Sequence, residues 1–576
     1  MPVEKGQASA GPDSGQARLL QLGYKQELAR SLPWSRNCAI TFSIMSVPTA
    51  VTGLYIQAYL YGGPVALIWG WLLVCVFTGT VALSMAEISS SFPVSGGLYF
   101  WSFQLGKHHG AIACWLTGWL NLLGQAAFVA GNEFSTVQLL STMLLLGTGT
   151  ASGGGYVMSR YMQLYIYAFL IISHAVLNTL RLDLLGRAAW VAAWWEIIGL
   201  IVICGVLPTV TPVLNHSAFV FTEFETNPSS GISSPVYTFL LGLLTACWTL
   251  TGFDATTHMM EETRAADVKG ALAMVYAVGA SFVLGFAYIL VLTLCTKDPA
   301  LVLDPANATA GLYPVAQIIW DSFQDRFRNG AGALLLLSIP LVCMFFCSWF
   351  SITSASRMLY AFSRDGAVPL SGLWQYVHPS TQTPIGAVWG LSTLALLLGL
   401  PLLQSYAAFT ATTSVAVIGL NIAYGIPIFL RVFVARDSFE PGPFSLGRWS
   451  YPCGYVAVAW ILVLTVIFVL PTVYPIGKVT LNYAGPAVGA LLVCSLGWWA
   501  LHAHSWFTGP VPNIDNSDAV HVNYIITDPP RSFSNAPSRA GKQWALGRGL
   551  TVEVAADSLT ELQKQPARSP LSRGSL

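Results

Sequence analysis

Residues 43–53 read SIMSVPTAVTG, and they interrupt an apolar segment that is long enough to cross a membrane. Pro48 lacks a backbone N–H, and its ring clashes with the preceding turn of a helix. Small hydroxyl residues and Gly53 surround this proline. We therefore expect the helix of this segment to break at membrane depth.

A second interruption lies in the sixth apolar segment, where residues 245–257 read TACWTLTGFDATT. Gly252 stands there beside the carboxyl group of Asp254. A lone Pro or Gly in a membrane helix is usually a kink or a packing contact. Interruptions at corresponding places in two halves of a chain instead indicate an inverted-repeat transporter. Half-helix amino ends suit a carboxylate and carboxyl ends suit an ammonium group, so a zwitterionic amino acid would match both.

The whole chain has the composition of a membrane protein. Of its 576 residues, 54% are hydrophobic and 9% are charged, whereas soluble globular proteins have about 25% charged residues. The formal net charge of +1 gives no indication of a nucleic-acid partner. The ten cysteines contain no C-x-x-C pair and are typical of small buried residues, so we predict no metal and no cofactor.

We predict an all-α polytopic membrane protein, because a bilayer core needs roughly 20 apolar residues per helix. The twelve predicted segments are 39–60, 64–86, 111–131, 161–180, 188–208, 236–258, 271–295, 331–351, 384–404, 407–430, 454–475 and 482–502. The third can continue as a helix through Glu133 toward Leu146. One set of short loops holds ten Lys and Arg residues and the other set holds five. The positive-inside rule therefore places the richer set and both termini in the cytosol.

Ionisable side chains at membrane depth are costly and are functional candidates. The sequence places Glu196, Asp254 and His174 within the predicted segments. We interpret Asp254 and Glu196 as coupling or gating residues, and His174 as a packing residue. The alternatives are that Asp254 is a neutral acid bonded between helices and that Glu196 only pairs with a group at the inner mouth.

Four motifs resemble those of amino acid permeases in the amino acid–polyamine–organocation superfamily, in its amino acid/choline branch. They are AEISSSFPVSGGLY at 86–99, TGWLNLLGQ at 117–125, GFDA at 252–255 with EET at 261–263, and TSASRMLYAFSRDGAVP at 353–369. That branch includes plant bidirectional amino acid transporters and fungal GABA and choline permeases. With the break at residues 46–48, the markers run from about 43 to 431.

The resemblance implies alternating access by a ten-helix, five-plus-five inverted-repeat core at 37–430 with helices 1 and 6 broken. Two further helices would occupy 431–503, between cytosolic tails at 1–36 and 504–576. It implies that the break at Ser46 holds the substrate carboxylate and that Trp248 covers the substrate. The substrate-binding residues that we expect are Ser43, Ser46, Val47, Pro48, Thr49, Asn121, Gln125, Trp248, Gly252, Phe253 and Ala255.

Two positions depart from the pattern of the family. Relatives often carry small residues where this chain has Val47 and Pro48. Some relatives carry a lysine that replaces a bound sodium ion where this chain has Leu200, and Glu196 lies one turn earlier.

Charged residues also gather at the predicted inner mouth: Glu87, Glu261, Glu262, Arg357, Arg364 and Asp365. We expect ion pairs that break when an inner gate opens; a static, solvated ring of charge is the alternative. Glu87 lies at the carboxyl end of a helix, which is unfavourable for a carboxylate, so we expect it to have a basic partner.

The sequence favours a secondary active transporter of amino acids, with GABA as one candidate substrate and a proton as a candidate coupling ion. A choline or polyamine permease and a sensor that binds amino acids without moving them are the alternatives. No phosphate loop, nucleophile elbow or HExxH motif indicates an enzyme. We expect the plasma membrane, with an internal organelle as the alternative.

Overall fold

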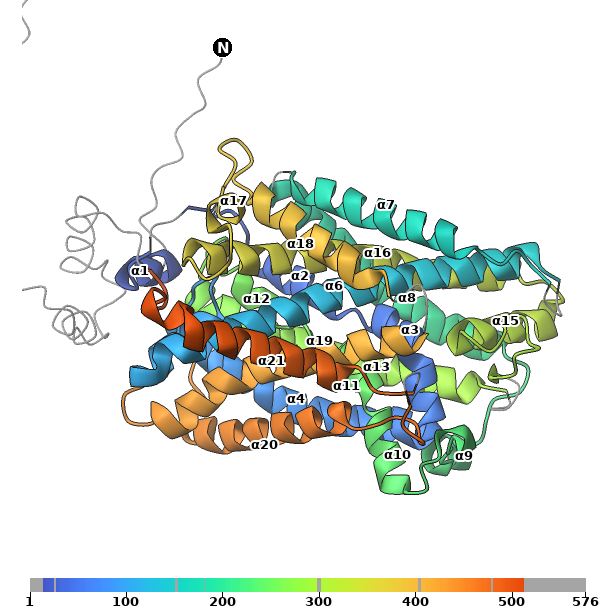
Figure 1. Cartoon of the computed structure of the whole chain (residues 1–576). Helices are drawn as coiled ribbons and strands as arrows, with labels where there is room; N and C mark the ends of the chain where they lie inside the picture. The colour runs from blue at the N-terminus through green and yellow to red at the C-terminus, as the bar shows by residue number, and fades with distance from the viewer. Residues whose placement is uncertain are drawn as a thin grey trace, which may run out of the picture. The chain divides into compact units, whose positions relative to one another are not determined.

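The computed structural model describes residues 14–24, 27–28, 30–150, 154–180, 182–297, 302–401, 406–477 and 480–511. These residues belong to one compact unit, Met1–Pro512. A second unit, Asn513–Leu576, lies outside the described residues, as does most of the tail predicted at 504–576. Within the described ranges the regular elements are helices joined by turns and loops (Figure 1), and isolated β-bridges join Leu32 to Thr263 and Tyr61 to Thr226.

Among the described residues, ten helices are long and apolar enough to span a membrane. These helices are Trp34–Leu60, Gly63–Ser91, Lys107–Thr148, Arg160–Asn178, Leu182–Val210, Ala266–Cys295, Ala331–Arg364, Ala408–Val434, Gly447–Val469 and Ala484–Leu501. The sixth and ninth predicted segments correspond to shorter apolar helices, Pro235–Thr249 and Ile385–Gly399. The prediction of a polytopic, all-α membrane protein is therefore confirmed, with ten of the twelve segments at full spanning length.

The α-helices are listed here with the labels of Figure 1. They are α1 (Ser14–Gln21), α2 (Trp34–Met45), α3 (Val47–Leu60), α4 (Gly63–Ser91), α5 (Leu98–Leu105), α6 (Gly110–Thr148), α7 (Arg160–Asn178), α8 (Leu182–Val210), α9 (Ser217–Thr222), α10 (Pro235–Gly242), α11 (Leu244–Thr249), α12 (Ala255–His258), α13 (Ala271–Cys295), α15 (Pro314–Phe327), α16 (Ala331–Arg364), α17 (Ser371–Trp374), α18 (Ile385–Gly399), α19 (Tyr406–Phe429), α20 (Ser450–Val469) and α21 (Ala484–Leu501).

The first span is broken as the sequence predicts. α2 ends just before Ser46, whose φ of −1° and ψ of 98° are not helical, and α3 begins just after it. Pro48 occupies the first turn of α3, where a missing N–H removes no helical hydrogen bond. The proline therefore helps to start the second half-helix.

The sixth span is broken as well. α11 ends at Thr249 and α12 begins at Ala255, so residues 250–254 form a non-helical link. Gly252 has a φ of +97° within this link, a conformation that glycine adopts without the steric cost of a Cβ atom. The predicted interruption at Gly252 is confirmed, and α12 beyond it is only four residues long.

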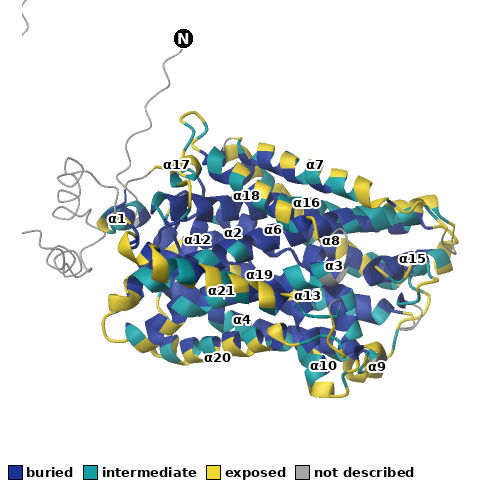
Figure 2. Ribbon diagram, viewed as in Figure 1, coloured by how far each residue is buried: buried dark blue, intermediate teal, exposed yellow. Residues whose placement is uncertain are grey.

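The long helices lie roughly side by side (Figure 1), and α6 packs against α5, α16 and α19 in the interior. α6 runs for 39 residues, so the third predicted segment does continue through Glu133. The outer helices expose large apolar side chains (Figure 2), for example Tyr165 and Phe169 on α7 and Val466 on α20. In water such a surface would be unfavourable, whereas it suits contact with lipid.

Candidate functional site

Glu196 of α8 lies at the break of the first span. Its Oε1 accepts a hydrogen bond of 3.0 Å from the backbone N–H of Val47, the first residue of α3. Next to it, Thr49 Oγ1 donates to Ser46 Oγ at 2.8 Å. Glu196 is 1% exposed. The amino end of a helix carries a partial positive charge and unsatisfied N–H groups, so it favours a carboxylate at this place.

The two broken helices are in contact with each other. A Cβ atom at Gly252 would lie 3.0 Å from the side chain of Ile44, in the last turn of α2, and 3.4 Å from the ring of Phe128. On the other side of the link, Thr41 Oγ1 and Thr256 Oγ1 form a hydrogen bond of 2.7 Å. The interruptions that lie about 200 residues apart in the sequence therefore meet in one buried region.

Asp254 is held by three side chains at the second break. Tyr424 donates its hydroxyl to Oδ1 at 2.7 Å, Gln125 donates Nε2 to Oδ2 at 2.9 Å, and His258 Nε2 lies 3.3 Å from Oδ2. The other ring nitrogen of His258 lies 3.2 Å from the backbone oxygen of Ser95. Asp254 is fully buried, and these partners satisfy the polar atoms that burial would otherwise leave unpaired.

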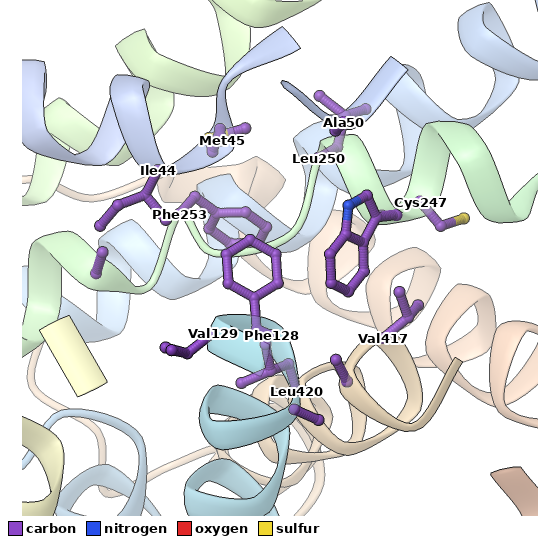
Figure 3. Packing of buried hydrophobic residues seen from close by; sticks show 14 of the residues in the cluster. Ile44, Met45, Ala50, Phe128, Val129, Cys247, Leu250, Phe253, Val417 and Leu420 are labelled. Carbon is purple, nitrogen blue, oxygen red and sulfur yellow. The ribbon is translucent and has the colours of Figure 1, made fainter. Parts of the chain in front are cut away.

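Aromatic rings fill the space between the two breaks. Trp248 packs on Phe128 with ring centroids 4.8 Å apart, and Phe253 packs on Tyr424 at 5.0 Å. Figure 3 shows Phe128 extending from α6 toward Phe253, with Ile44 and Met45 of α2 on one side and Val417 and Leu420 of α19 on another. Trp248 is 2% exposed, so the conformation is closed around this ring.

The remaining predicted site residues are also buried: Ser43, Val47, Pro48, Thr49, Asn121 and Ala255. Among the described residues, the hydroxyl of Ser43 and both amide atoms of Asn121 have no hydrogen-bond partner. Buried polar atoms of this kind are unusual in proteins and call for an explanation. The Ser43 hydroxyl and the Asn121 amide could form hydrogen bonds with a bound molecule.

The structure contains a second buried pair that the sequence did not predict. His174 Nδ1 on α7 lies 2.6 Å from Glu133 Oε1 on α6, and both side chains are fully buried. His174, interpreted above as a packing residue, therefore has an acidic partner. The sequence did not indicate two buried ionisable residues, Glu133 and His258. Glu133 lies just beyond the third predicted segment and His258 is the last residue of the sixth, so a search of the segment ends would have identified both.

Two buried ion pairs lie at the predicted inner mouth. Arg364 at the end of α16 contacts both carboxylate oxygens of Glu261, at 3.2 and 3.3 Å, and Arg357 Nε lies 3.3 Å from Glu262 Oε1. All four side chains are at most 8% exposed. Burial raises the pKa of Glu262, and the neighbouring Arg357 opposes that effect. A solvated ring of charge does not describe this arrangement, because the pairs are buried.

Asp365 is held at the same mouth by Tyr99 and by the end of the described chain. Tyr99 donates its hydroxyl to Oδ2 at 2.8 Å, and Val511 donates its backbone N–H to Oδ1 at 3.1 Å. Burial raises the pKa of Asp365 to about 6, although Arg364 and these two donors act in the opposite direction. The segment that follows α21 is thus attached to the inner mouth.

Glu87 does not have the basic partner that we expected. Its carboxylate accepts hydrogen bonds from Ser445 Oγ at 2.9 Å, the Leu446 N–H at 3.1 Å and Ser450 Oγ at 2.5 Å. Within the described residues it forms no salt bridge. Neutral donors from the loop before α20 and from its first residue thus replace the cation that the sequence suggested. The unfavourable position of a carboxylate at a helix carboxyl end predicts that a partner is needed, but it does not predict which residues supply it.

Described residues of the segment before α2 contact the residues of these ion pairs. The ring of Tyr24 lies 4.7 Å from the guanidinium carbon of Arg364. Leu32 bonds through its backbone to Glu262 and Arg264, each at 3.0 Å. Tyr24 and Leu32 are 1% exposed. Among the described residues, no group of three or more His, Cys, Asp and Glu side chains is arranged to hold a metal ion.

Comparison with known proteins gives consistent results. The sequence profile described as amino acid permease matches residues 32–493. The chain is 45% identical over 515 residues to the amino-acid permease BAT1 homolog of Oryza sativa subsp. japonica, covering 89% of this chain and 99% of that protein. It is 45% identical over 503 residues to the amino-acid permease BAT1 of Arabidopsis thaliana, covering 87% and 97%. The amino-acid permease 2 of Neurospora crassa is 30% identical over 514 residues, covering 88% and 90%.

Proposed function

The chain belongs to the amino acid permease family, and we propose that it moves amino acids across a membrane by alternating access, coupled to the movement of protons. The observation that carries this proposal is the contact between two interrupted helices with a buried acid at each break, Glu196 at the first and Asp254 at the second. Ionisable groups at membrane depth are costly, and in transporters they mark substrate and proton pathways.

We propose that the substrate binds between the breaks, against Ser46 and Trp248. The unpartnered Ser43 and Asn121 supply further polar contacts. GABA, with a carboxylate and an ammonium group, fits this class of substrate as other amino acids do. Choline would favour a cage of aromatic rings around its cation. The candidate rings for such a cage are Trp248, Phe253, Trp349 and Phe350. Trp248 and Phe253 pair with other rings, and among the described residues no ring contact joins them to Trp349 and Phe350, so an amino acid is the better match.

Alternating access requires a gate on each side of this site, and we propose that the inner gate is the inner-mouth cluster, Glu261, Glu262, Arg357, Arg364 and Asp365. Opening would separate Arg357 and Arg364 of α16 from their acidic partners in the segment after α12. The excess of Lys and Arg in one set of loops supports a cytosolic position for this mouth and for both termini. We propose the plasma membrane as its location.

Uptake of labelled amino acids into proteoliposomes tests the transport function. Purified protein should take up at least one amino acid from a panel that includes GABA, with choline and polyamines as competitors. Trp248→Ala should raise the apparent substrate constant strongly at normal expression, and Ser46→Leu should block entry. Binding without uptake would identify a sensor, and uptake of choline alone would overturn the amino acid proposal.

An imposed pH step tests the proton coupling. Wild-type protein should accumulate substrate when the outside is made acidic. Asp254→Asn should retain substrate binding and exchange but lose this accumulation, and Glu196→Gln tests the second acid in the same way. If a variant accumulates substrate in response to the pH step as the wild type does, the residue that it changes has no role in the coupling.

A further inference from the structure

Glu196 occupies the place where a substrate carboxylate would bind. The first four N–H groups of a helix have no partner within the helix. In α3 these belong to positions 47–50: Val47 donates to Glu196, Pro48 has no N–H, and Ala50 donates to the backbone oxygen of Ser46 at 3.1 Å. At most two of these amides, those of Val47 and Thr49, are therefore suited to a carboxylate. Glu196 already holds the first of them.

Two carboxylates cannot share this end of α3 while both are ionised. The amino end of a helix carries only about half a positive charge, and like charges in a buried site strongly disfavour each other's ionisation. In the described part of the chain, Glu196 has no ion pair that would neutralise it. A substrate carboxylate at Val47 therefore requires Glu196 either to move away or to become neutral.

The surroundings of Glu196 favour neutralisation over movement. α8 packs against α2, α13, α15 and α16, and Glu196 is 1% exposed. The titratable groups in electrostatic contact with it are the thiols of Cys343 and Cys347 on α16. Cys347 also interacts with Glu133, the acid paired with His174. No cation from these helices competes for the Glu196 carboxylate in the described structure.

We propose that Glu196 is a built-in competitor of the substrate carboxylate, and that one proton taken up by Glu196 releases the Val47 N–H to the substrate. A hydronium ion of the solvent gives its proton to the Glu196 carboxylate and becomes water, so one O–H bond breaks and one forms. The hydrogen bond from Val47 then passes to a substrate oxygen, and no other covalent bond changes. This inference rests on the proposed function, because it needs a substrate with a carboxylate. It assigns the proton that accompanies substrate binding to Glu196, and it leaves Asp254, which has three partners in this conformation, in the coupling role proposed above.

The test is a comparison of binding by an amino acid and by the matching amine that lacks the carboxylate. Wild-type affinity for the amino acid should rise as the pH falls, by up to about tenfold per pH unit over the range in which Glu196 is ionised in the free protein, and should level off where Glu196 is already neutral, with up to one proton taken up per substrate. The amine should show no such dependence. In Glu196→Gln the amino acid should bind with an affinity independent of pH and without proton uptake.

Two further variants separate this role from a structural one. Glu133→Gln removes another buried acid, which pairs with His174 and not with the amino end of α3, and it should keep the pH dependence of the wild type. Glu196→Asp has a shorter side chain that does not reach Val47, so it should bind the amino acid more tightly at high pH with a weaker pH dependence. The inference is wrong if Glu196→Gln takes up a proton on binding, or if the amine responds to pH as the amino acid does. If no amino acid binds to the wild type at any pH, the proposed function fails and this inference fails with it.

Discussion

Removal of the Arg364 guanidinium should open the inner mouth. Arg364 makes two contacts with the fully buried carboxylate of Glu261 and lies over the rings of Tyr24 and Tyr360. In Arg364→Met, Glu261 keeps the N–H of Ser95 as a donor at 3.1 Å but loses both contacts with the guanidinium of Arg364. Breaking a buried ion pair from one side costs about 3–5 kcal/mol. Because an open mouth would hydrate Glu261, this cost falls on the closed conformation.

A shift of this size is easy to measure. At about 1.4 kcal/mol per tenfold change, the population that is open to the cytosol should rise by about two to four orders of magnitude. Cys347 is a native reporter, because its thiol is 1% exposed and donates to the backbone oxygen of Ile44 at the first break, 3.2 Å away. In protein that retains only this one of the ten cysteines, a polar maleimide applied from the cytosolic side should label Arg364→Met far faster than the parent.

Two matched variants decide what causes the change. Lys297→Met breaks an exposed pair with Asp325, in which Lys297 Nζ lies 2.7 Å from the carboxylate, and exposed pairs contribute about 0–1 kcal/mol. This variant should label as the parent does. Changing both Arg364 and Glu261 to Met removes both members of the buried pair and should restore slow labelling. Equal labelling rates in Arg364→Met and Lys297→Met would refute the assignment of the gate.

Three other predictions follow from buried or strained groups. Burial raises the pKa of Asp365 from 3.8 to about 6, so neutral Asp365 stabilises the closed conformation. This stabilisation is complete below about pH 4 and is lost as the pH rises through about 6. Labelling of Cys347, relative to Asp365→Asn at the same pH, should therefore slow by up to about tenfold from pH 7 to pH 5; an equal response in both proteins would contradict this. His174→Ala leaves Glu133 buried without its partner and should lower the free energy of unfolding by about 3–5 kcal/mol, and thermal unfolding should show recovery when Glu133 is also changed to Leu. Gly252→Ala forces a Cβ atom onto a backbone with a φ of +97°, a strain of about 1–3 kcal/mol, and should reduce uptake, whereas Gly279→Ala, which meets no atom within 4 Å, should not.

Hydropathy predicts the membrane helices because the bilayer imposes an apolar segment of nearly fixed length. It does not predict where a helix ends in water or in a polar interior. α16 continues from the predicted limit at residue 351 to Arg364 through a polar stretch that packs at the inner mouth. The sixth span is shorter than predicted because its last part is the link around Gly252. Pro48 and Gly252 marked the breaks, since each has a local backbone consequence.

The partners of the buried acids could not be predicted in the same way. Which side chain meets Glu133 or Asp254 depends on how neighbouring helices are rotated about their axes. Tyr424 is 170 residues from Asp254, and His174 is 41 residues from Glu133. A hydropathy pattern constrains helix length, whereas these pairings depend on angles that only the packed bundle fixes.

The inner gate shows most clearly what a sequence leaves out. The N–H and the carbonyl oxygen of Leu32 bond to Glu262 and Arg264, each at 3.0 Å, and Asn37 Nδ2 donates to Thr263 Oγ1 at 2.8 Å. These bonds tie the start of the first span to the chain after α12, whereas Arg357 and Arg364 belong to α16 on the opposite side of the mouth. The bonds of Leu32 involve only backbone atoms, so no residue type marks them in the sequence. If the inner mouth opens as we propose, we expect the two sides to separate along the ion pairs rather than along the Leu32 bridge, so that Leu32 moves together with the segment after α12.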